Sequence, residues 1–182
     1  MHDYEIKMDG KEHAYASGAI RYNKDKGDFN LIPCEVVCHM VNDIAQWEYN
    51  GQIDIIDYYK GLIRCAINHQ YEEAIIFIII GKYVSNIDDR MLSYQAIDVM
   101  NGFAMMLRDL AIHYQKGARK YGVDNWKKGC KDGTGIPESS FYDSGVRHTL
   151  QFLNGETDEP HHISAIWNFF NAIYLRDKIW NR

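Results

Sequence analysis

Apolar residues recur at every third or fourth position through the middle of this chain, and this helical periodicity constrains the fold more than any other feature. The pattern begins at Cys34 in a first expected helix, which ends at Asn50-Gly51, and it resumes in a second helix. Residues at this spacing lie on one face of an α-helix and can be buried together. The pattern is carried by Val36, Val37, Met40, Val41, Ile44 and Trp47, and then by Ile53, Ile56, Tyr59, Leu62, Ile63 and Ile67. Only three prolines are present to interrupt helices, so the sequence predicts an all-α helical bundle.

The apolar segment Glu72–Val84 is ambiguous, because its β-branched run suits a buried strand as well as a buried helix. We favour a helix, since no partner strand is visible elsewhere, and we expect few strand residues outside Ala74–Val84. A face this apolar is also a candidate subunit interface, so a homo-oligomer is an open alternative to burial in the core of one chain.

Three further helices are expected towards the C-terminus. A long helix runs from about Leu92 to Lys116, and Gly117 marks its end. Two shorter helices follow at about 140–153 and 159–177, and only about five residues join them. A link this short predicts an antiparallel helix hairpin.

We expect a single domain over residues 1–182, because a chain of this length supports one sizeable core. Residues 1–33 are polar and without a sustained period, which predicts an irregular, extended arm. Residues 34–116 form the helical expansion, and residues 117–182 hold a motif-rich loop and the helix hairpin.

Charge and cysteine content limit the partners of this chain. The formal net charge is −5, whereas a general nucleic-acid binder is usually basic, so no nucleic-acid partner is expected. The longest apolar run, Ala74–Ile80, is far too short to span a membrane, and no signal peptide is visible. We therefore expect a cytoplasmic protein without a membrane partner. The scattered cysteines are interpreted as buried free thiols, and they are Cys34, Cys38, Cys65 and Cys130.

Side chains that bind phosphate or metal ions are densest between Gly117 and Trp167. They are Arg119, Lys120, Lys127, Lys128, Asp143, Arg147, His148, Glu156, Asp158, Glu159, His161 and His162. Arginine and lysine bind phosphate, the first through its planar fork and the second as a point charge. Each of these residues taken alone would be interpreted as a surface charge or a structural histidine.

The link between the two short helices carries three carboxylates within four residues, Glu156, Asp158 and Glu159. Oxygen ligands at this density suit a hard cation such as Mg²⁺. Acidic residues at a helix N-terminus also complement the helix dipole, and on spacing alone this second interpretation is slightly favoured. Asp143 is similarly open, because Ser140 and Asp143 have the spacing of a capping box.

Aromatic residues flank these charged groups. They are Tyr121, Trp126, Phe141 and Tyr142. A nucleobase binds by stacking on such rings, although ordinary core packing is the favoured interpretation for Trp126.

Four motifs together resemble a known family. They are SGAIR, DFNLIP, GARKYGVDNWKKG and DSGVRHTLQFLNGETDEPHHISAIWN, in this order along the chain. The combination resembles the N-terminal domain of the phage dATP/dGTP diphosphohydrolases, relatives of the MazG-like all-α nucleoside triphosphate pyrophosphohydrolases. The resemblance implies a helical, often oligomeric domain encoded by a phage, a prophage or a bacterium. It also implies cleavage between the α- and β-phosphates, dependent on Mg²⁺ with Mn²⁺ as an alternative ion.

The residue chemistry and the resemblance together indicate roles for particular residues, and Arg119 and His162 are included on their chemistry alone. Metal ligands are expected among Asp143, Glu156, Asp158, Glu159 and one of His161 and His162. Substrate contacts are expected from Arg119, Lys120, Tyr121, Asn125, Trp126, Arg147 and Asn168. Catalytic roles are expected for Glu159, Glu156 and His148, with a glutamate as general base. The chain departs from the family at Pro160, where an acidic residue is expected, and in the helical expansion, which the short form of the family lacks.

The leading hypothesis is therefore a metal-dependent hydrolase that converts a nucleoside triphosphate, in particular a purine deoxynucleotide, to the monophosphate and pyrophosphate. The alternative is a non-catalytic nucleotide-binding or helical interaction protein.

Overall fold

The computed structural model describes residues 11–14, 20–23, 27–46, 51–84, 91–129 and 133–180. These residues form six α-helices, joined by short 3₁₀ and π-helical turns, and four short strands. The helices are α1 (Cys34–Gln46), α2 (Ile55–Ile67), α3 (Tyr71–Ile79), α4 (Ala96–Tyr121), α5 (Glu138–Leu153) and α6 (His161–Trp180). The predicted all-α class is confirmed. None of the described helices is long and apolar enough to cross a membrane.

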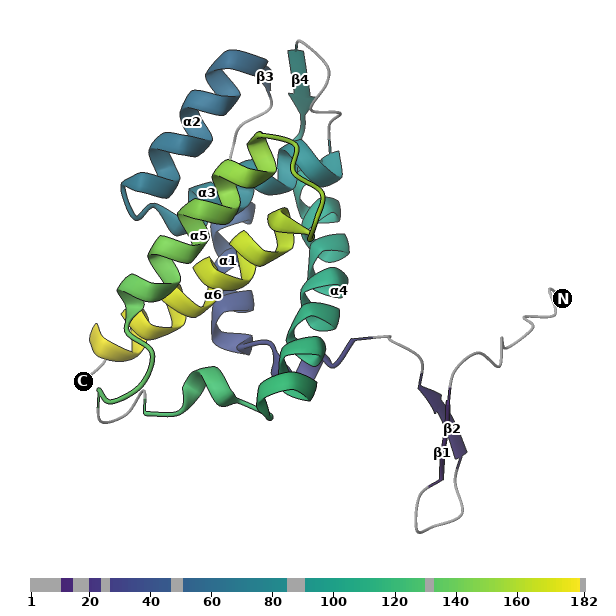
Figure 1. Ribbon diagram of the computed structural model, residues 1–182. Helices are drawn as coiled ribbons and strands as arrows, with labels where there is room; N and C mark the ends of the chain where they lie inside the picture. Colours follow the sequence, from purple (N-terminus) through teal and green to yellow (C-terminus); the bar gives the residue numbers. More distant parts are fainter. Residues whose placement is uncertain are drawn as a thin grey trace, which may run out of the picture.

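Helix α6 lies at the centre of the bundle and packs against α1, α3, α4 and α5 (Figure 1). Its buried residues point in every direction around the helix axis, which is the pattern of a helix enclosed by its neighbours. They include Ile163, Ala165, Ile166, Phe169, Phe170, Ala172 and Ile173. The site described below lies at the first turn of this central helix, so the core holds it rigidly.

Helices α5 and α6 form the predicted antiparallel hairpin, joined by residues 154–160 (Figure 1). Their close approach depends on Gly145, where an added Cβ would lie 2.4 Å from the ring of Phe169. The carbonyl of Pro160 accepts hydrogen bonds from the amides of Ile163 and Ser164, and so begins α6.

Helix α3 continues into a π-helical turn, η2 (Ile80–Val84). The prediction of a helix for the apolar run is therefore confirmed. Ile75, Ile78 and Ile79 are fully buried within this one chain, so the core interpretation holds for this face. The backbone of the turn is crowded, because an added Cβ on Gly81 would lie 2.1 Å from the Tyr58 hydroxyl oxygen.

Four strands were not expected. Strand β1 (Lys11–Ala14) pairs with β2 (Ile20–Asn23), and β3 (Gly51–Asp54) pairs with β4 (Met91–Tyr94), both antiparallel. The second pair joins segments far apart in the sequence, and periodicity within one segment cannot reveal such a partner. Ile53 therefore lies in a strand, and Asp54 caps α2 by accepting from the amide of Ile56.

Helix boundaries also differ from the prediction. Helix α4 passes through Gly117 and ends at Tyr121, where Gly122 adopts a φ of 93° that favours glycine. Helix α5 begins at Glu138, so Ser140 and Asp143 lie inside it and the predicted capping box is wrong.

Residues 27–33 of the predicted arm lie against the bundle. The amide of Asp28 donates to the carbonyl of Ala111 in α4, and Leu31, in the 3₁₀ turn η1 (Phe29–Leu31), is buried. The cysteine prediction is wrong for two residues, since Cys34 and Cys38 are exposed and only Cys65 of the described cysteines is buried. Trp47 and Cys130 lie outside the described residues.

Candidate metal and phosphate site

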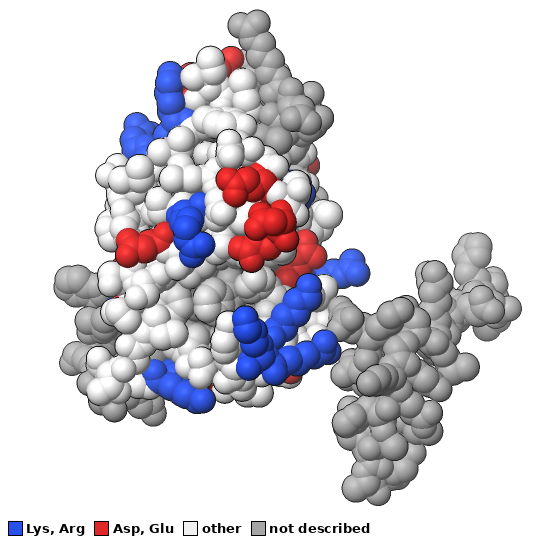
Figure 2. Space-filling view, in the orientation of Figure 1, with Lys and Arg blue, Asp and Glu red and all other residues white. Residues whose placement is uncertain are grey.

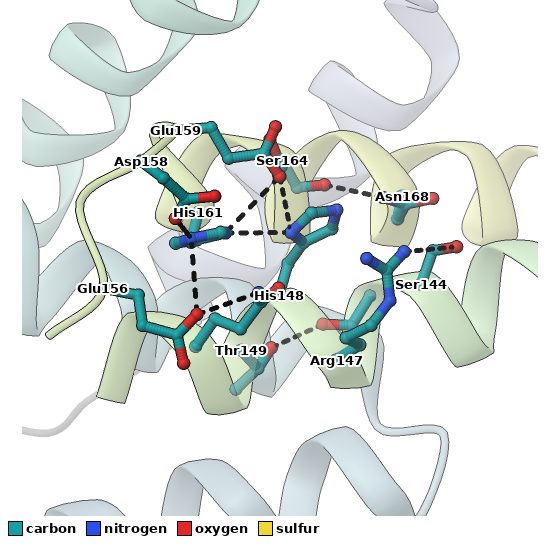
Figure 3. A network of polar contacts seen from close by, with 12 residues as sticks. Ser144, Arg147, His148, Thr149, Glu156, Asp158, Glu159, His161, Ser164 and Asn168 are labelled. Atoms are coloured by element: carbon teal, nitrogen blue, oxygen red, sulfur yellow. Dashed lines mark hydrogen bonds and ion pairs between the residues drawn. The ribbon is translucent and has the colours of Figure 1, made fainter. Parts of the chain in front are cut away.

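The first turn of α6 and the third turn of α5 bring two histidines together. The Nδ1 atoms of His148 and His161 lie 3.1 Å apart, and the residues are 8% and 2% exposed (Figure 3). Glu159 Oε1 faces both rings, at 3.1 Å from His148 Nδ1 and 3.5 Å from His161 Nδ1. These three groups can contribute one ligand atom each to a single ion.

The other ring nitrogen of His161 faces two more carboxylates. Its Nε2 lies 2.8 Å from Asp158 Oδ1 and 4.0 Å from Glu156 Oε2. A neutral imidazole that donates its Nε2–H to Asp158 keeps its lone pair on Nδ1, where Glu159 and His148 lie. A carboxylate that accepts from a ligating histidine is a common arrangement in metal sites, because it fixes the tautomer and the ring orientation.

The loop holds Glu156 in place by two amide donors. Gln151 Nε2 and Asn154 Nδ2 each donate to one of its oxygens at 3.0 Å. Both donors come from the end of α5, so this carboxylate is positioned by the same helix that carries His148.

Burial and charge set the protonation of these groups. Burial lowers the pKa of His148, and the neighbouring Glu159 opposes this effect. The hydrogen bond from His161 lowers the pKa of Asp158. Near neutral pH, His148 is therefore an uncharged ligand or proton acceptor and Asp158 is an anion.

Helix α4 adds a histidine that the sequence analysis missed. Burial lowers the pKa of His113 to about 4, while Glu159 opposes this and Lys116 and His148 act on it electrostatically. The sequence signal was the spacing of His113, Lys116 and Lys120, which places them on one side of the helix. Of these three residues, His113 interacts electrostatically with Glu159 and His148 of the cluster, and the two lysines are exposed.

Two predicted ligands are outside the groups of described residues that could hold an ion. His162 packs near Tyr83 and Phe152, with ring centroids 5.9 and 6.0 Å away, and burial lowers its pKa to about 4. Asp143 is exposed and outside the described clusters that could hold an ion. Five residues separate Asp143 from His148, which is about 140° around an α-helix, so the two side chains leave different faces.

An open hollow lies over the carboxylates. It is lined by residues 155–162, together with Phe152 and with Lys82 from the π-helical turn. Tyr83, next to Lys82, donates to Asp109 of α4 at 2.9 Å. The turn is thereby attached to the helix that carries His113.

A second cavity, of about 240 Å³, lies at the C-terminal end of α4. Its walls are mainly aromatic and apolar, and its lining includes Leu31, Tyr114, Tyr121, Asn125, Trp126, Ile136 and Trp167. Trp126 is buried against Tyr174, with ring centroids 5.0 Å apart, so it packs in the core and also faces the cavity. Asn125 and Trp126 belong to the 3₁₀ turn η3 (Asn125–Lys127).

Trp167 connects the two regions. It lines the aromatic cavity, and its ring centroid lies 5.9 Å from that of His113. Six residues of α6 separate His161 from Trp167, which is about 9 Å of helix. Of the predicted aromatic residues, Tyr121 and Trp126 line this cavity, whereas Tyr142 stacks on His69 and donates to the carbonyl of Ile67 in α2.

The predicted basic residues lie around this region. Arg119 and Lys120 are exposed in the last turn of α4, and the Lys120 ammonium lies 4.8 Å from the centre of the Tyr121 ring. Arg147 is exposed beside His148 and donates to Ser144 at 3.5 Å (Figure 3). Asn168 is buried and donates to the carbonyl of Ser164. Figure 2 shows acidic side chains gathered near the middle of this face, with basic side chains on either side.

Comparison with known proteins is consistent with this geometry. No curated protein sequence and no solved structure matches the chain significantly. A family model does match residues 85–180, which is more than half of the chain. The matched segment includes the ligand cluster and most of the aromatic cavity, and it leaves out Leu31, Lys82 and Tyr83. The chain belongs to the family described as dATP/dGTP diphosphohydrolase, N-terminal.

Proposed function

We propose that this protein hydrolyses a purine deoxynucleoside triphosphate to the monophosphate and pyrophosphate in a reaction that requires a divalent metal ion. The observation that carries the proposal is the convergence of His148, His161, Glu156, Asp158 and Glu159 beside an aromatic cavity. The family description names dATP and dGTP, which supports the purine preference.

The donor set fits a divalent ion. Three carboxylates and two imidazoles held this close would repel or compete for protons without a cation, and a cation relieves that cost. Carboxylate oxygens suit Mg²⁺, and the imidazole nitrogens make Mn²⁺ a good alternative. Glu159, His148 and His161 would hold the ion, with Asp158 orienting His161 and Glu156 nearby.

A bound divalent ion would polarise the phosphate and lower the pKa of a water molecule. The side chain of Glu159 is 46% exposed, so water reaches it, and it is our candidate for the general base. Burial lowers the pKa of His148, so its imidazole is uncharged near neutral pH and its Nδ1 lone pair is available to the same ion.

The aromatic cavity would bind the base. Tyr121 and Trp126 offer ring faces for stacking, and Asn125 offers both a hydrogen-bond donor and an acceptor for the base edge. The short distance along α6 between Trp167 and His161 is one that a deoxyribose and its α-phosphate can span. Lys116, Lys120 and Arg147 would neutralise phosphate charge between the two regions.

Product analysis tests this proposal directly. The protein is incubated with each canonical nucleoside triphosphate and deoxynucleoside triphosphate, with Mg²⁺ or Mn²⁺, and the products are separated by chromatography. We expect dATP or dGTP to give the monophosphate and pyrophosphate, and Glu159→Gln to abolish turnover while the fold is retained. Asp57→Asn is the matched control, because Asp57 is an exposed carboxylate on α2 that pairs with Lys60.

Two outcomes would contradict the proposal. Release of orthophosphate would assign a different reaction. Absence of turnover, combined with nucleotide-dependent thermal stabilisation, would favour the non-catalytic binding protein, a function with which Pro160 in place of an expected acid is consistent.

A further inference from the structure

Lys82 is the one lysine or arginine among the described residues that line the hollow over the carboxylates, and it lies outside the family-matched segment. Lys82 lies in the π-helical turn η2, three residues before the match begins. Its neighbours across the hollow are Glu156, Asp158 and Glu159. A phosphate group entering this acidic hollow would need positive charge in addition to that of a metal ion.

The turn that carries Lys82 is held firmly from two sides. The Tyr58 hydroxyl donates to the carbonyl of Phe77 at 3.1 Å and packs against the backbone of Gly81. On the other side, an added Cβ on Gly102 of α4 would lie 3.0 Å from Val84. π-Helical turns of this kind are frequent at functional sites. Lys82 therefore projects from a fixed backbone, and its ammonium acts electrostatically on His162 at the start of α6.

Of the helices that border the site, α4 and α6 run in the same direction, which gives the site two distinct ends. Asp109 lies near His162, His113 lies near Trp167, and Tyr114 donates to Asn171 at 2.8 Å. The hollow includes Glu159 and His161 of the cluster and lies at the end marked by Asp109 and His162, and the aromatic cavity lies at the other end, beyond His113 and Trp167.

We propose that Lys82 binds the pyrophosphate portion of the substrate, so that the nucleotide lies with its base in the aromatic cavity and its β- and γ-phosphates in the hollow. This inference rests on the proposed function. Lys116 and Lys120 follow His113 along α4 towards the cavity, where the α-phosphate and the sugar would pass, whereas Lys82 lines the hollow at the Asp109 end of the site.

This orientation defines the step. A water oxygen attacks the α-phosphorus, and its proton passes to the Glu159 carboxylate. The bond between the α-phosphorus and the bridging oxygen breaks, and its electron pair leaves with pyrophosphate. Lys82 neutralises charge on the leaving group, and the monophosphate remains on the side of the aromatic cavity.

Binding of each product separately tests the assignment. Inorganic pyrophosphate and the purine deoxynucleoside monophosphate are titrated, in the presence of Mg²⁺, into the wild-type protein and into Lys82→Met. We expect the Kd for pyrophosphate to rise about tenfold, as for the loss of one charge-assisted hydrogen bond, and the Kd for the monophosphate to change less than about twofold. Lys82→Arg should restore most of the pyrophosphate affinity, since it keeps the charge.

Lys60→Met is the control, because Lys60 is an exposed lysine on α2 whose partner is Asp57. Unchanged pyrophosphate affinity in Lys82→Met, or an equal loss for both products, would overturn the proposal. Calorimetric binding does not depend on turnover, so the result is separable from the product analysis. A protein that fails to hydrolyse nucleotides but binds pyrophosphate through Lys82 would refute the proposed reaction and keep this contact.

Discussion

His161 is the residue on which the site depends, since carboxylates lie next to both of its ring nitrogens. Asp158 accepts from Nε2 and Glu159 lies next to Nδ1. A neutral imidazole binds a metal ion through one nitrogen only. An ion can therefore lie either beside Nε2, with Asp158 and Glu156, or beside Nδ1, with Glu159 and His148. The shorter contact, between Nε2 and Asp158, favours an ion on the Nδ1 side.

Asp158→Asn tests this assignment. The amide oxygen of Asn can still accept a hydrogen bond from His161, but it lacks the negative charge that strengthens a histidine as a metal ligand. The affinity for Mn²⁺ should therefore fall by about 10–100-fold, as it does when other carboxylates that orient a ligating histidine are replaced. Titration calorimetry with Mn²⁺ measures the change. If Asp158 only complements the dipole of α6, the variant should lose stability and bind Mn²⁺ as the wild type does.

Two aromatic residues of the cavity should respond differently to truncation. Tyr121 is 58% exposed, so Tyr121→Ala should leave stability almost unchanged. It should weaken the binding free energy of the nucleotide by about 1–3 kcal/mol, the contribution of one stacked base. Trp126 is 6% exposed, so Trp126→Ala should cost about 3–5 kcal/mol of unfolding free energy. Nucleotide titration and urea unfolding of both variants give the comparison. If the two variants lost the same nucleotide affinity and the same stability, Tyr121 would not be part of the binding site.

The hairpin of α5 and α6 positions His148 against His161, and it depends on one close helix contact. Gly145→Ala would place a methyl group 2.4 Å from a Phe169 ring atom. We expect a loss of about 1–3 kcal/mol in unfolding free energy, as for other overpacked sites, together with weaker metal binding because the two histidines separate.

Gly117→Ala is the matched change in α4. Nothing lies within 4 Å of an added Cβ there, and alanine is the better helix former by about 1 kcal/mol. Urea unfolding should therefore show a gain in stability for this variant and a loss for Gly145→Ala. A loss of similar size in both would mean that helix propensity and packing do not explain the two glycines.

Across the whole molecule, Glu72 joins three helices. Its carboxylate accepts from Arg176 of α6 through two guanidinium nitrogens and contacts His39 Nε2 of α1 at 3.1 Å. Burial alone would raise the pKa of Glu72, but the hydrogen bonds and charge of Arg176, a backbone hydrogen bond and the charge of His39 together outweigh it, and the pKa is lowered.

Stability should therefore depend on this carboxylate in acid. A carboxyl with a folded pKa below its unfolded value stabilises the protein above the unfolded pKa of about 4.5, and this contribution is lost as the pH falls through the folded pKa. We expect Glu72→Gln to cost about 1.5–3 kcal/mol at pH 7 and to flatten the decline below pH 4.5. Urea unfolding between pH 7 and pH 3.5 measures both. An identical acid decline in the variant would assign the effect to other groups.

The oligomeric state stays a prediction at this scale. The apolar run of α3 is buried in its own chain, so an interface would have to use other exposed apolar residues, such as Ile97 and Met105 of α4. Solution mass measured at several protein concentrations tests it.

The local sequence pattern determined much of the fold of this protein. The three- and four-residue spacing of apolar side chains specifies helices, because a helix buries one face whatever its partners are. The short link after Leu153 specified the hairpin, since two helices joined by so few residues must turn back on each other. The density of charged residues after Gly117 indicated the candidate site, because most of its residues are close together in the sequence.

Only the tertiary structure decided which of these side chains meet. His161 and His162 are adjacent in sequence and point about 100° apart on α6, but only the packed structure shows that His161 contacts the carboxylates while His162 packs near Tyr83. His113 and Lys82 join the site from α4 and η2, and β3 finds its partner in β4. Such contacts depend on how helices cross and on which surfaces are buried together, and one stretch of sequence does not contain that information.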